Sequence, residues 1–494
     1  MDTIGISNVG AEVEPAPVLG KMRRPSADKE QRIVDAFLKD LMNSSARRSS
    51  IVETALKAHR QYCCIMSNKG PSPHFVRVFD PHFFATVSSS VASEAAAILA
   101  SPNFFAYEAN GATDDMLAQS FSEAARYHWK ENPNSRASIV SMLYQSRLYG
   151  TAFGCTFWNQ EYRKTGYWEE TQIPRQVPMI DDFGRVQFQQ VMDTQRQFVI
   201  KEKKVKDSAW FKTLNFFNCF PDSEVETVRE GRYFIYRQPR TLEYVRNMGK
   251  TKQWYPGIVK EILANPSEFT GYLVDDAMTR QIDAESGFNV GGGDTVDSEN
   301  PLIDTYEYYT PDGVATIVGN RVAAYREGYL TGYYPIVQLR GHMVPGEFWG
   351  MSDLQVVETQ LAALQHMHSA QATEAVLNVY RPFICSDPSA NLAEMKYTPG
   401  AVWRITGGDV NALRQVPADT SGIQVSQALS SEFRSRIDVA IGSSDVSRGS
   451  LPTRSQSATA VMQSTEKNAQ RMGPRIIALE DDLIVPIAEQ FRSL

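Results

Sequence analysis

The strongest constraint on the fold is a helical pattern that runs from Asp353 to Val379 and meets no helix breaker until Pro382. Ser352 and Gln355 have the spacing of a capping box, with Ser at the N-cap and Gln at N3. About 27 residues at 1.5 Å each give a helix of roughly 40 Å, about twice the usual length. The pattern places one set of side chains on a common face: Leu354, Val357, Leu361, Leu364, His368 and Ala375.

A second helical pattern covers residues 421–441, and two short strands are expected between the helices, at 383–385 and 401–406. A polar loop at 442–456 follows, and further helix is expected from about Ser457 to Leu494, with a break at Gly473-Pro474. Two long helices that project together bury little of their own apolar face. We therefore expect a large homo-oligomer in which neighbouring copies cover that face.

The N-terminal part of the chain is mostly helical in pattern. Residues 1–27 have no periodicity and are interpreted as a mobile arm. Helices are expected to begin near four points: Asp28 as an N-cap, Ser49-Ser50, Pro81 and Thr113. One more helix should end at Tyr149-Gly150, where Gly150 suits a left-handed C′ position.

From residue 151 the pattern changes to strands. Strand-like runs occupy residues 151–158, 186–191, 198–205, 216–220 and 233–236. Short helices are expected at 242–248 and 258–263, before a glycine-rich linker at 287–294. A β-meander then covers 303–310, 314–318 and 322–325. The order of helices, strands and helices predicts an α+β fold.

Composition narrows the class of protein. The 494 residues carry 50 Lys+Arg and 57 Asp+Glu, a net charge of −7, which argues against a basic DNA-coating protein. No apolar stretch is long enough to span a bilayer, and the N-terminus does not resemble a secretory signal. The five cysteines form no CxxC pair, so we expect reduced, mostly buried thiols in a protein assembled in a reducing cytoplasm.

The search for catalytic chemistry gives no candidate. His366 and His368 are two positions apart on a helix and point in different directions, so they cannot chelate one metal ion. Lys250 lies in a Gly-Lys-Thr triplet, but Tyr244 stands where a phosphate loop needs glycine. Aspartate doublets are better explained as solvated turns than as cation sites. We therefore expect no enzyme activity, no cofactor and no metal.

The order of elements, together with certain residues, resembles the portal proteins of tailed bacteriophages over about residues 30–494. Five segments carry the resemblance: Arg147-Leu-Tyr-Gly150 leading into a strand, Phe220-Pro-Asp222, Tyr334-Pro-Ile-Val337, the run from Gly346 to Leu354 that opens the long helix, and the 442–456 loop. Each motif is weak alone, and their order makes the resemblance more specific.

The resemblance implies a ring of twelve subunits at a capsid vertex, through which the genome is packaged and ejected. A wing would cover residues 28–350, stem helices 351–379 and 421–441, a clip 380–420, and C-terminal wing helices 457–494. The family's crown would be absent or truncated. The first stem helix would start at Ser352, Asp353 and Gln355. The tunnel loop, 442–456, would bring Asp445, Arg448 and Arg454 close to DNA.

The implied partners are the terminase large subunit, head–tail adaptor or tail proteins, capsid and scaffold proteins, and the double-stranded DNA that passes through the channel, with no membrane. The protein would be assembled in the host cytoplasm and located at the portal vertex of the virion. The net negative charge suits a channel wall that repels DNA, and ordinary solubility explains it equally well. Two alternatives stay open: another head–tail structural protein of the adaptor type, and a cytoplasmic enzyme of unknown reaction.

Overall fold

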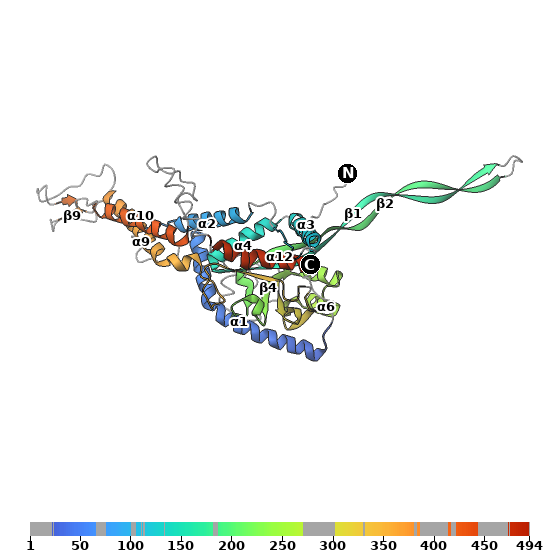
Figure 1. Ribbon diagram of the computed structural model, residues 1–494, viewed down its shortest axis with the longest axis horizontal. Coiled ribbons are helices and arrows are strands. Elements are labelled where there is room, and N and C mark those ends of the chain that lie inside the picture. Colours follow the sequence, from blue (N-terminus) through green and yellow to red (C-terminus); the bar gives the residue numbers. More distant parts are fainter. Residues whose placement is uncertain are drawn as a thin grey trace.

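The computed structural model describes most of the chain as a central body with two projections, a helical hairpin at one end and a β-ribbon at the other (Figure 1). Among the described residues the fold is mixed α and β, in agreement with the α+β prediction. They are 22, 24–65, 76–99, 105–109, 111, 114–132, 134–180, 186–269, 302–329, 331–379, 383–385, 413–415, 421–442, 473 and 475–493.

Helix α1 spans Ala27–Tyr62 as one continuous helix, which corrects two predictions. The N-cap is Ser26, whose side chain accepts a hydrogen bond from Lys29 N, and Asp28 lies within the first turn. No second helix opens at Ser49-Ser50. Arg48 is buried at that point and donates hydrogen bonds to the carbonyl oxygens of Cys219 and Phe217, so tertiary contacts hold the helix across the expected boundary.

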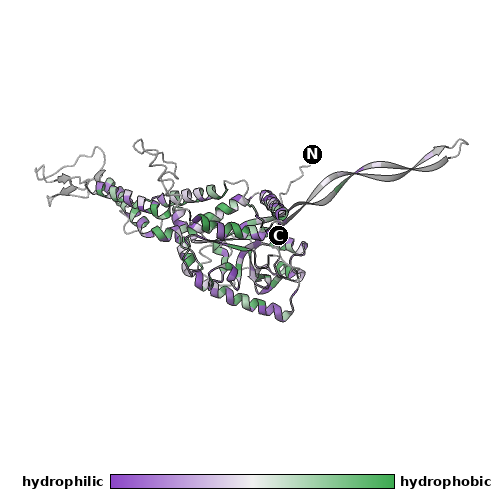
Figure 2. Ribbon diagram, viewed as in Figure 1, coloured by the Kyte–Doolittle hydropathy of each residue, from purple (hydrophilic) through white to green (hydrophobic). Residues whose placement is uncertain are grey.

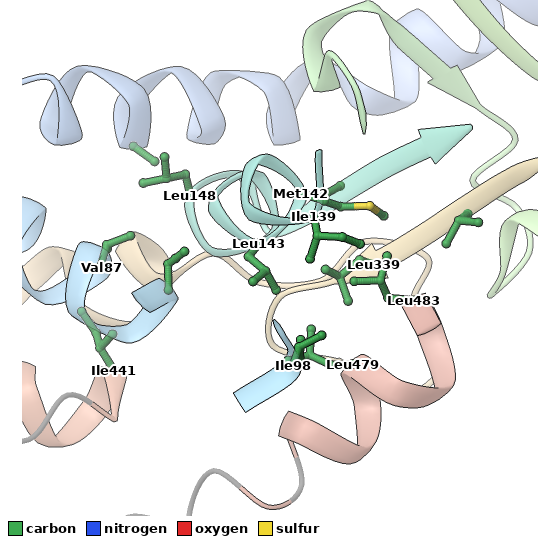
Figure 3. Close-up of a cluster of buried hydrophobic side chains, with 14 of the residues drawn as sticks. Val87, Ile98, Ile139, Met142, Leu143, Leu148, Leu339, Ile441, Leu479 and Leu483 are labelled. Atoms are coloured by element: carbon green, nitrogen blue, oxygen red, sulfur yellow. The ribbon is translucent and has the colours of Figure 1, made fainter. Parts of the chain in front are cut away.

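Three further helices follow: α2 (His82–Leu99), α3 (Asp115–Glu131) and α4 (Ser135–Tyr149). Helix α4 ends at Gly150, whose φ of 82° is left-handed, as predicted. The expected cap at Thr113 lies outside the described residues. Figure 3 shows α4 in the centre of the main core, with Ile139, Met142 and Leu143 fully buried. This core brings together segments that lie far apart in the sequence: α2, α4, the strand around Leu339, Ile441 and Leu479.

Strands β1 (Thr151–Ile180) and β2 (Val186–Leu214) form a continuous antiparallel ribbon, paired from Phe153↔Leu214 to Ile180↔Val186. Shorter strands were predicted in this region, and the length of β1 and β2 was not. Only the root of the ribbon belongs to the body, where Phe153 and Phe211 are buried and β1 also pairs with β8 (Ile336–Arg340). The remainder projects away from the body (Figure 1).

The second sheet has the order β3-β4-β5-β6-β7. Its strands are β3 (Cys219–Pro221), β4 (Phe234–Thr241), β5 (Leu302–Thr310), β6 (Gly313–Val318) and β7 (Arg321–Glu327), so the predicted meander is confirmed. The strand expected at 216–220 begins instead as a 3-10 turn, Phe216–Asn218, because the Asn215 side chain caps Phe217 N. Short helical segments lie at Val228–Glu230, α5 (Leu242–Lys250), α6 (Pro256–Ala264) and α7 (Pro266–Phe269).

The helical hairpin consists of α9 (Asp353–Val379) and α10 (Ser421–Ile441), with the bounds expected from the sequence. Strand β9 (Phe383–Cys385) is confirmed, and its partner among the described residues is β10 (Leu413–Gln415). The C-terminal part contains a π-helical turn, Glu480–Ile484, and α12 (Val485–Ser493). The strand expected at 401–406, the linker at 287–294 and the helix expected from Ser457 to the break at Gly473-Pro474 lie outside the described residues, apart from Gly473. The helix expected after that break is confirmed over residues 475–493.

Three further predictions concern the N-terminal arm, the cysteines and membrane-spanning helices. The interpretation of residues 1–27 as an arm is corrected at its end, because Met22 forms an antiparallel bridge with Arg326 and Ser26 caps α1. Of the described cysteines, Cys155 and Cys219 are buried free thiols, but Cys63 and Cys64 are exposed, contrary to the expectation of mostly buried thiols. No helix in the described part of the chain has the length and apolarity needed to cross a bilayer.

Candidate connector site at the base of the helical hairpin

The long helix α9 begins as the sequence predicts. Gln355 Oε1 accepts a hydrogen bond from Ser352 N at 2.7 Å, and Ser352 Oγ accepts one from Gln355 N at 3.3 Å. Both halves of the capping box are therefore formed. Ser352 and Asp353 are buried, so the start of α9 is fixed inside the body and does not fray into solvent.

Asp353 lies at the centre of a largely buried group of ionisable side chains that we call the anchor cluster, of which His342 is the most exposed. Its members come from five parts of the chain: Glu94, Arg147, His342, Asp353 and Arg475. Asp353 Oδ1 is 3.2 Å from Arg147 Nη1 and 2.8 Å from His342 Nε2. Burial alone would raise the pKa of Asp353, but Arg147 and His342 outweigh it and hold that pKa below its ordinary value.

Arg147 connects the two carboxylates of the anchor cluster. Its Nε lies 3.0 Å from Glu94 Oε1, and its Nη2 also donates to that oxygen. Burial would lower the pKa of Arg147, but Asp353 and Glu94 together raise it above its ordinary value. A guanidinium shared between two buried carboxylates satisfies charges that would be costly to leave alone.

Arg475 adds the C-terminal segment to the anchor cluster. Its Nε lies 3.2 Å from Glu94 Oε1, its Nη2 is 3.0 Å from Ser146 Oγ, and its Nη1 donates to the Gly341 carbonyl oxygen at 2.6 Å. One side chain thus joins α2, α4 and the loop before α9. These contacts connect the base of the helical hairpin to helices α2 and α4 and to the C-terminal segment that carries Arg475.

Three glycines allow the backbones beside the anchor cluster to approach closely. A Cβ on Gly150 would lie 2.2 Å from the Gly350 carbonyl oxygen, and one on Gly341 would lie 2.4 Å from Ser146 O. Gly341 N donates to Gly150 O at 2.7 Å. The Arg147–Gly150 and Gly346–Leu354 motifs, which are distant in the sequence, therefore meet in space.

A second polar contact holds α2 against the hairpin higher up. His368 Nδ1 and Arg434 Nη2, from α9 and α10, lie 3.0 and 3.1 Å from Asp80 Oδ2. His82 Nε2, at the start of α2, lies 2.9 Å from Asp438 Oδ1 on α10. His368 therefore contacts a carboxylate from another segment of the chain. No group of three or more metal-ligating side chains occurs in the described part of the chain.

The two hairpin helices pack together through Leu361, Leu364 and Ile437, which are buried near the base. Farther out, Gln371 Nε2 donates to Ser426 Oγ at 3.0 Å. Both helices carry hydrophobic and hydrophilic residues along their length (Figure 2). Several apolar side chains of the hairpin stay in solvent: Val376 is 43% exposed, Val425 62%, Leu429 37% and Val439 53%.

The predicted site residues thus have different outcomes. Ser352, Asp353 and Gln355 lie together at the start of α9, whereas Asp445, Arg448 and Arg454 of the 442–456 loop lie outside the described residues. Glu94, His342 and Arg475 were not predicted from the sequence, and Arg147 was given no role in a site. The sequence does single out Glu94 in one way, because it is the only acidic residue in the Ser- and Ala-rich helix α2.

Residues 318–494 match a family described as bacteriophage head to tail connecting protein. No curated protein matches the chain. The matched segment contains the helical hairpin and three members of the anchor cluster: His342, Asp353 and Arg475. The match supports a bacteriophage connector that interacts with head and tail proteins in the virion. It covers neither the ribbon nor helices α1 to α4.

Proposed function

We propose that the protein is a portal-type connector, one subunit of a ring that forms the channel through which a phage genome is packaged and ejected. The observation that carries the proposal is the helical hairpin, which projects from the body, begins in the buried anchor cluster and lies within the segment that matches the connector family. The proposal includes a ring of twelve subunits with a channel, contacts with the packaging motor, the scaffold and DNA, and assembly in the host cytoplasm.

The exposed apolar side chains of the hairpin support a ring. Val425 and Val439 on α10, with Val376 on α9, are in water in a single subunit. Full burial of a valine side chain contributes roughly 1.5–3 kcal/mol, so covering the exposed half of each of these valines contributes about 1 kcal/mol. Head-to-tail contacts between copies cover such faces in every subunit and close into a ring when the rotation permits.

The first test is the mass and shape of the purified protein. Twelve copies of 55.3 kDa would weigh about 0.66 MDa, which light scattering separates from a monomer, and electron microscopy would show a ring. The double variant Val425→Glu, Val439→Glu should remain folded and monomeric. The matched control Gln427→Glu, Ser435→Glu changes exposed polar positions of the same helix and should still form rings. A wild-type protein that stays monomeric would contradict the proposal.

The adaptor alternative differs in its partner. The proposed portal binds the terminase large subunit that drives DNA, whereas the adaptor alternative does not require that partner. Co-purification of the ring with the packaging ATPase would favour the portal. Rings that bind tail proteins but not the ATPase would favour an adaptor.

We also propose that the chain is not an enzyme. The Gly-Lys-Thr triplet lies at the C-terminal end of α5, where Lys250 is the last helical residue and Thr251 the C-cap. Phosphate groups bind at helix N-termini, where free N–H groups and the helix dipole favour an anion. The purified protein should therefore not hydrolyse ATP, and a turnover that Lys250→Ala abolishes would contradict this.

A further inference from the structure

A cavity of about 810 Å³ opens between α1 and α4, outside the segment that matches the connector family. Its volume lies within the range of about 300–1,000 Å³ that is typical of binding pockets. Apolar and aromatic side chains form much of its wall: Leu56 from α1, Tyr144, Leu148 and Tyr149 from α4, and Phe217 from the turn before β3. Among the described residues that line it, none belongs to the anchor cluster or to the helical hairpin, so the function proposed above does not use this cavity.

The inner wall of the cavity is aromatic and held in place. His59 Nδ1 lies 3.0 Å from the hydroxyl oxygen of Tyr149, and the Tyr149 and Phe217 ring centroids are 4.9 Å apart. The His59 ring also meets the Phe217 ring edge to face. Three rings that contact one another give a preformed apolar surface, which loses little conformational freedom when a ligand covers it.

The aromatic wall continues to the outside of the molecule. Tyr144 lines the cavity, and its ring centroid is 6.1 Å from that of Tyr62. Tyr62 in turn lies 4.9 Å from Phe84, which is 44% exposed. Grooves lined by aromatic side chains bind proline-rich segments in the extended polyproline conformation.

The ionisable side chains of the cavity wall are basic. Arg136, in the first turn of α4, and His59 line the cavity, and no carboxylate is among the described residues that do so. Opposite charges at the rim of an interface favour one partner over others. The segment that suits this cavity is therefore extended, proline-rich and acidic.

Such a segment precedes α1 in this chain. Residues 12–19, which we call the proline segment, read Glu-Val-Glu-Pro-Ala-Pro-Val-Leu. Pro15 and Pro17 fix two backbone φ angles at the polyproline value, which lowers the entropy cost of binding. Glu12 and Glu14 supply the negative charge, and residues 1–20 contain no Lys or Arg. The proline segment thus matches the cavity in both apolar character and charge.

The arm that carries the proline segment leaves the body at the start of α1. Met22 forms an antiparallel bridge with Arg326 on β7. The next residue of β7, Glu327, lies 2.8 Å from Lys29 Nζ in the first turn of α1. Met22 is therefore fixed beside the N-terminal end of that helix.

The proline segment is too short to reach the cavity of its own subunit. Leu56 lies 27 positions after Lys29 on α1, about 40 Å along the helix, and a right-angle bend at the middle would still leave about 29 Å. Pro15 is seven residues before Met22, which is at most about 25 Å of fully extended chain. Only the cavity of another copy is available to it.

A ring of identical copies brings that cavity to the arm. Head-to-tail contacts join two different surfaces of the subunit. The origin of the arm and the cavity belong to opposite ends of the 36-residue helix α1, and those ends lie on different sides of the body (Figure 1). One surface of each copy therefore carries the arm and another carries the cavity, as a head-to-tail contact requires.

We propose that the proline segment of one subunit docks in the cavity between α1 and α4 of a neighbouring copy, with its two prolines against Tyr144 and Tyr149 and its acids beside Arg136. The inference rests on the ring of the proposed function and adds a contact to it. A peptide from a different protein is the competing occupant, and the crosslinking experiment separates the two.

Site-specific crosslinking in the full-length protein tests the contact. A benzophenone-bearing phenylalanine replaces Val18, and this chain is mixed with an isotope-labelled wild-type chain before assembly and illumination. The expected product joins two chains, about 111 kDa from two 55.3 kDa copies, with the crosslink in the cavity wall of the labelled chain, at 56–59, 136–149 or 213–217. The same probe at Met42, 57% exposed on α1, should give no crosslink to these residues. Crosslinks within one chain, to another surface or to a different protein would overturn the proposal.

The concentration dependence of assembly gives an independent readout. Pro15→Gly with Pro17→Gly restores the backbone freedom that the prolines remove, and Ala137→Trp fills the cavity from an exposed position of α4. Each should raise the concentration needed for half-assembly at least about tenfold, and their combination should add little because both remove the same contact. Ser7→Gly with Asn8→Gly, in the same arm, is the control and should assemble like the wild type. Wild-type monomers would contradict the ring itself, whereas normal assembly of both variants would overturn only the arm contact.

Discussion

Arg147 and Asp353 are 206 positions apart in the sequence, yet Arg147 Nη1 lies 3.2 Å from Asp353 Oδ1. The contact joins the end of α4, in the body, to the first residue of α9, in the helical hairpin. Both side chains are almost fully buried, at 3% and 0% exposed. The orientation of the hairpin therefore depends on an ion pair that water does not screen.

Arg147→Leu should destabilise the protein strongly. The substitution leaves the carboxylates of Glu94 and Asp353 in the core without their shared guanidinium, and breaking such a buried group costs about 3–5 kcal/mol. Urea unfolding measures the loss. Arg436→Ala is the control, because Arg436 pairs with Glu432 on the surface and its loss should cost less than about 1 kcal/mol. Equal effects of the two variants would show that the anchor cluster is not a stabilising centre.

Gly150→Ala should destabilise the protein more than Gly346→Ala, although both glycines have a left-handed backbone conformation. Both glycines have left-handed φ values, 82° and 78°, so alanine costs about 1–2 kcal/mol of conformational strain at either position. Only at Gly150 does the new Cβ also meet a backbone atom, the Gly350 carbonyl oxygen at 2.2 Å. Thermal unfolding should show a clearly larger drop for Gly150→Ala, and similar drops would mean that the close approach does not matter.

Acidification should weaken the contact between α2 and the hairpin. Burial lowers the pKa of His368 below its ordinary value, and Arg434 and His82 act in the same direction, against the attraction of Asp80. Because the folded pKa is the lower one, the unfolded chain binds the proton first. This stability is therefore present above about pH 6.5 and is lost as the pH falls through the folded pKa.

The pH dependence can be assigned with neighbouring variants. His368→Gln should reduce the fall in unfolding free energy between about pH 7.5 and 5.5, because the group that titrates has been removed. His366→Gln, two residues away and exposed, should keep the wild-type slope. If both variants follow the wild type, the pH response originates elsewhere.

The 442–456 loop gives a prediction from sequence alone. Arg448 and Arg454 are its only basic side chains, and weak, salt-screened contacts of such arginines with phosphates could hold packaged DNA yet allow it to move. In assembled particles, Arg448→Ala with Arg454→Ala should leave rings intact and reduce the retention or length of packaged DNA. Normal DNA content would mean that the loop does not grip the genome.

Local signals predicted the elements of this protein where they act within one helix or hairpin. Ser352 and Gln355 fixed the start of α9 because a capping box is complete within four residues. The strands expected at 314–318 and 322–325 likewise form the β6–β7 hairpin, in which Val318 pairs with Arg321. Helix α1 was divided wrongly because Ser49 and Ser50 have the residue types of an N-cap, whereas buried Arg48 binds carbonyl groups 169 and 171 positions away.

Apart from Asp353 and the isolated acid Glu94, the members of the anchor cluster could not be predicted, because they are individually ordinary. Glu94, Arg147 and Arg475 are separated by 53 and 328 positions, and no spacing relates them before the chain folds. The long ribbon was missed for another reason. Its polar residues and two prolines interrupt the hydrophobic alternation by which strands are recognised, so the sequence resembles several short strands.

Arg475 and the residues after it enter the same core as the end of α10. Leu479 and Leu483 are fully buried there together with Ile441, while Arg475 is held by Glu94 and by two backbone carbonyl groups. Both ends of the stretch between 442 and 475 are thus fixed by contacts that do not depend on the covalent chain between them. A single proteolytic cut there should leave two fragments that remain associated and migrate as one particle until a denaturant separates them.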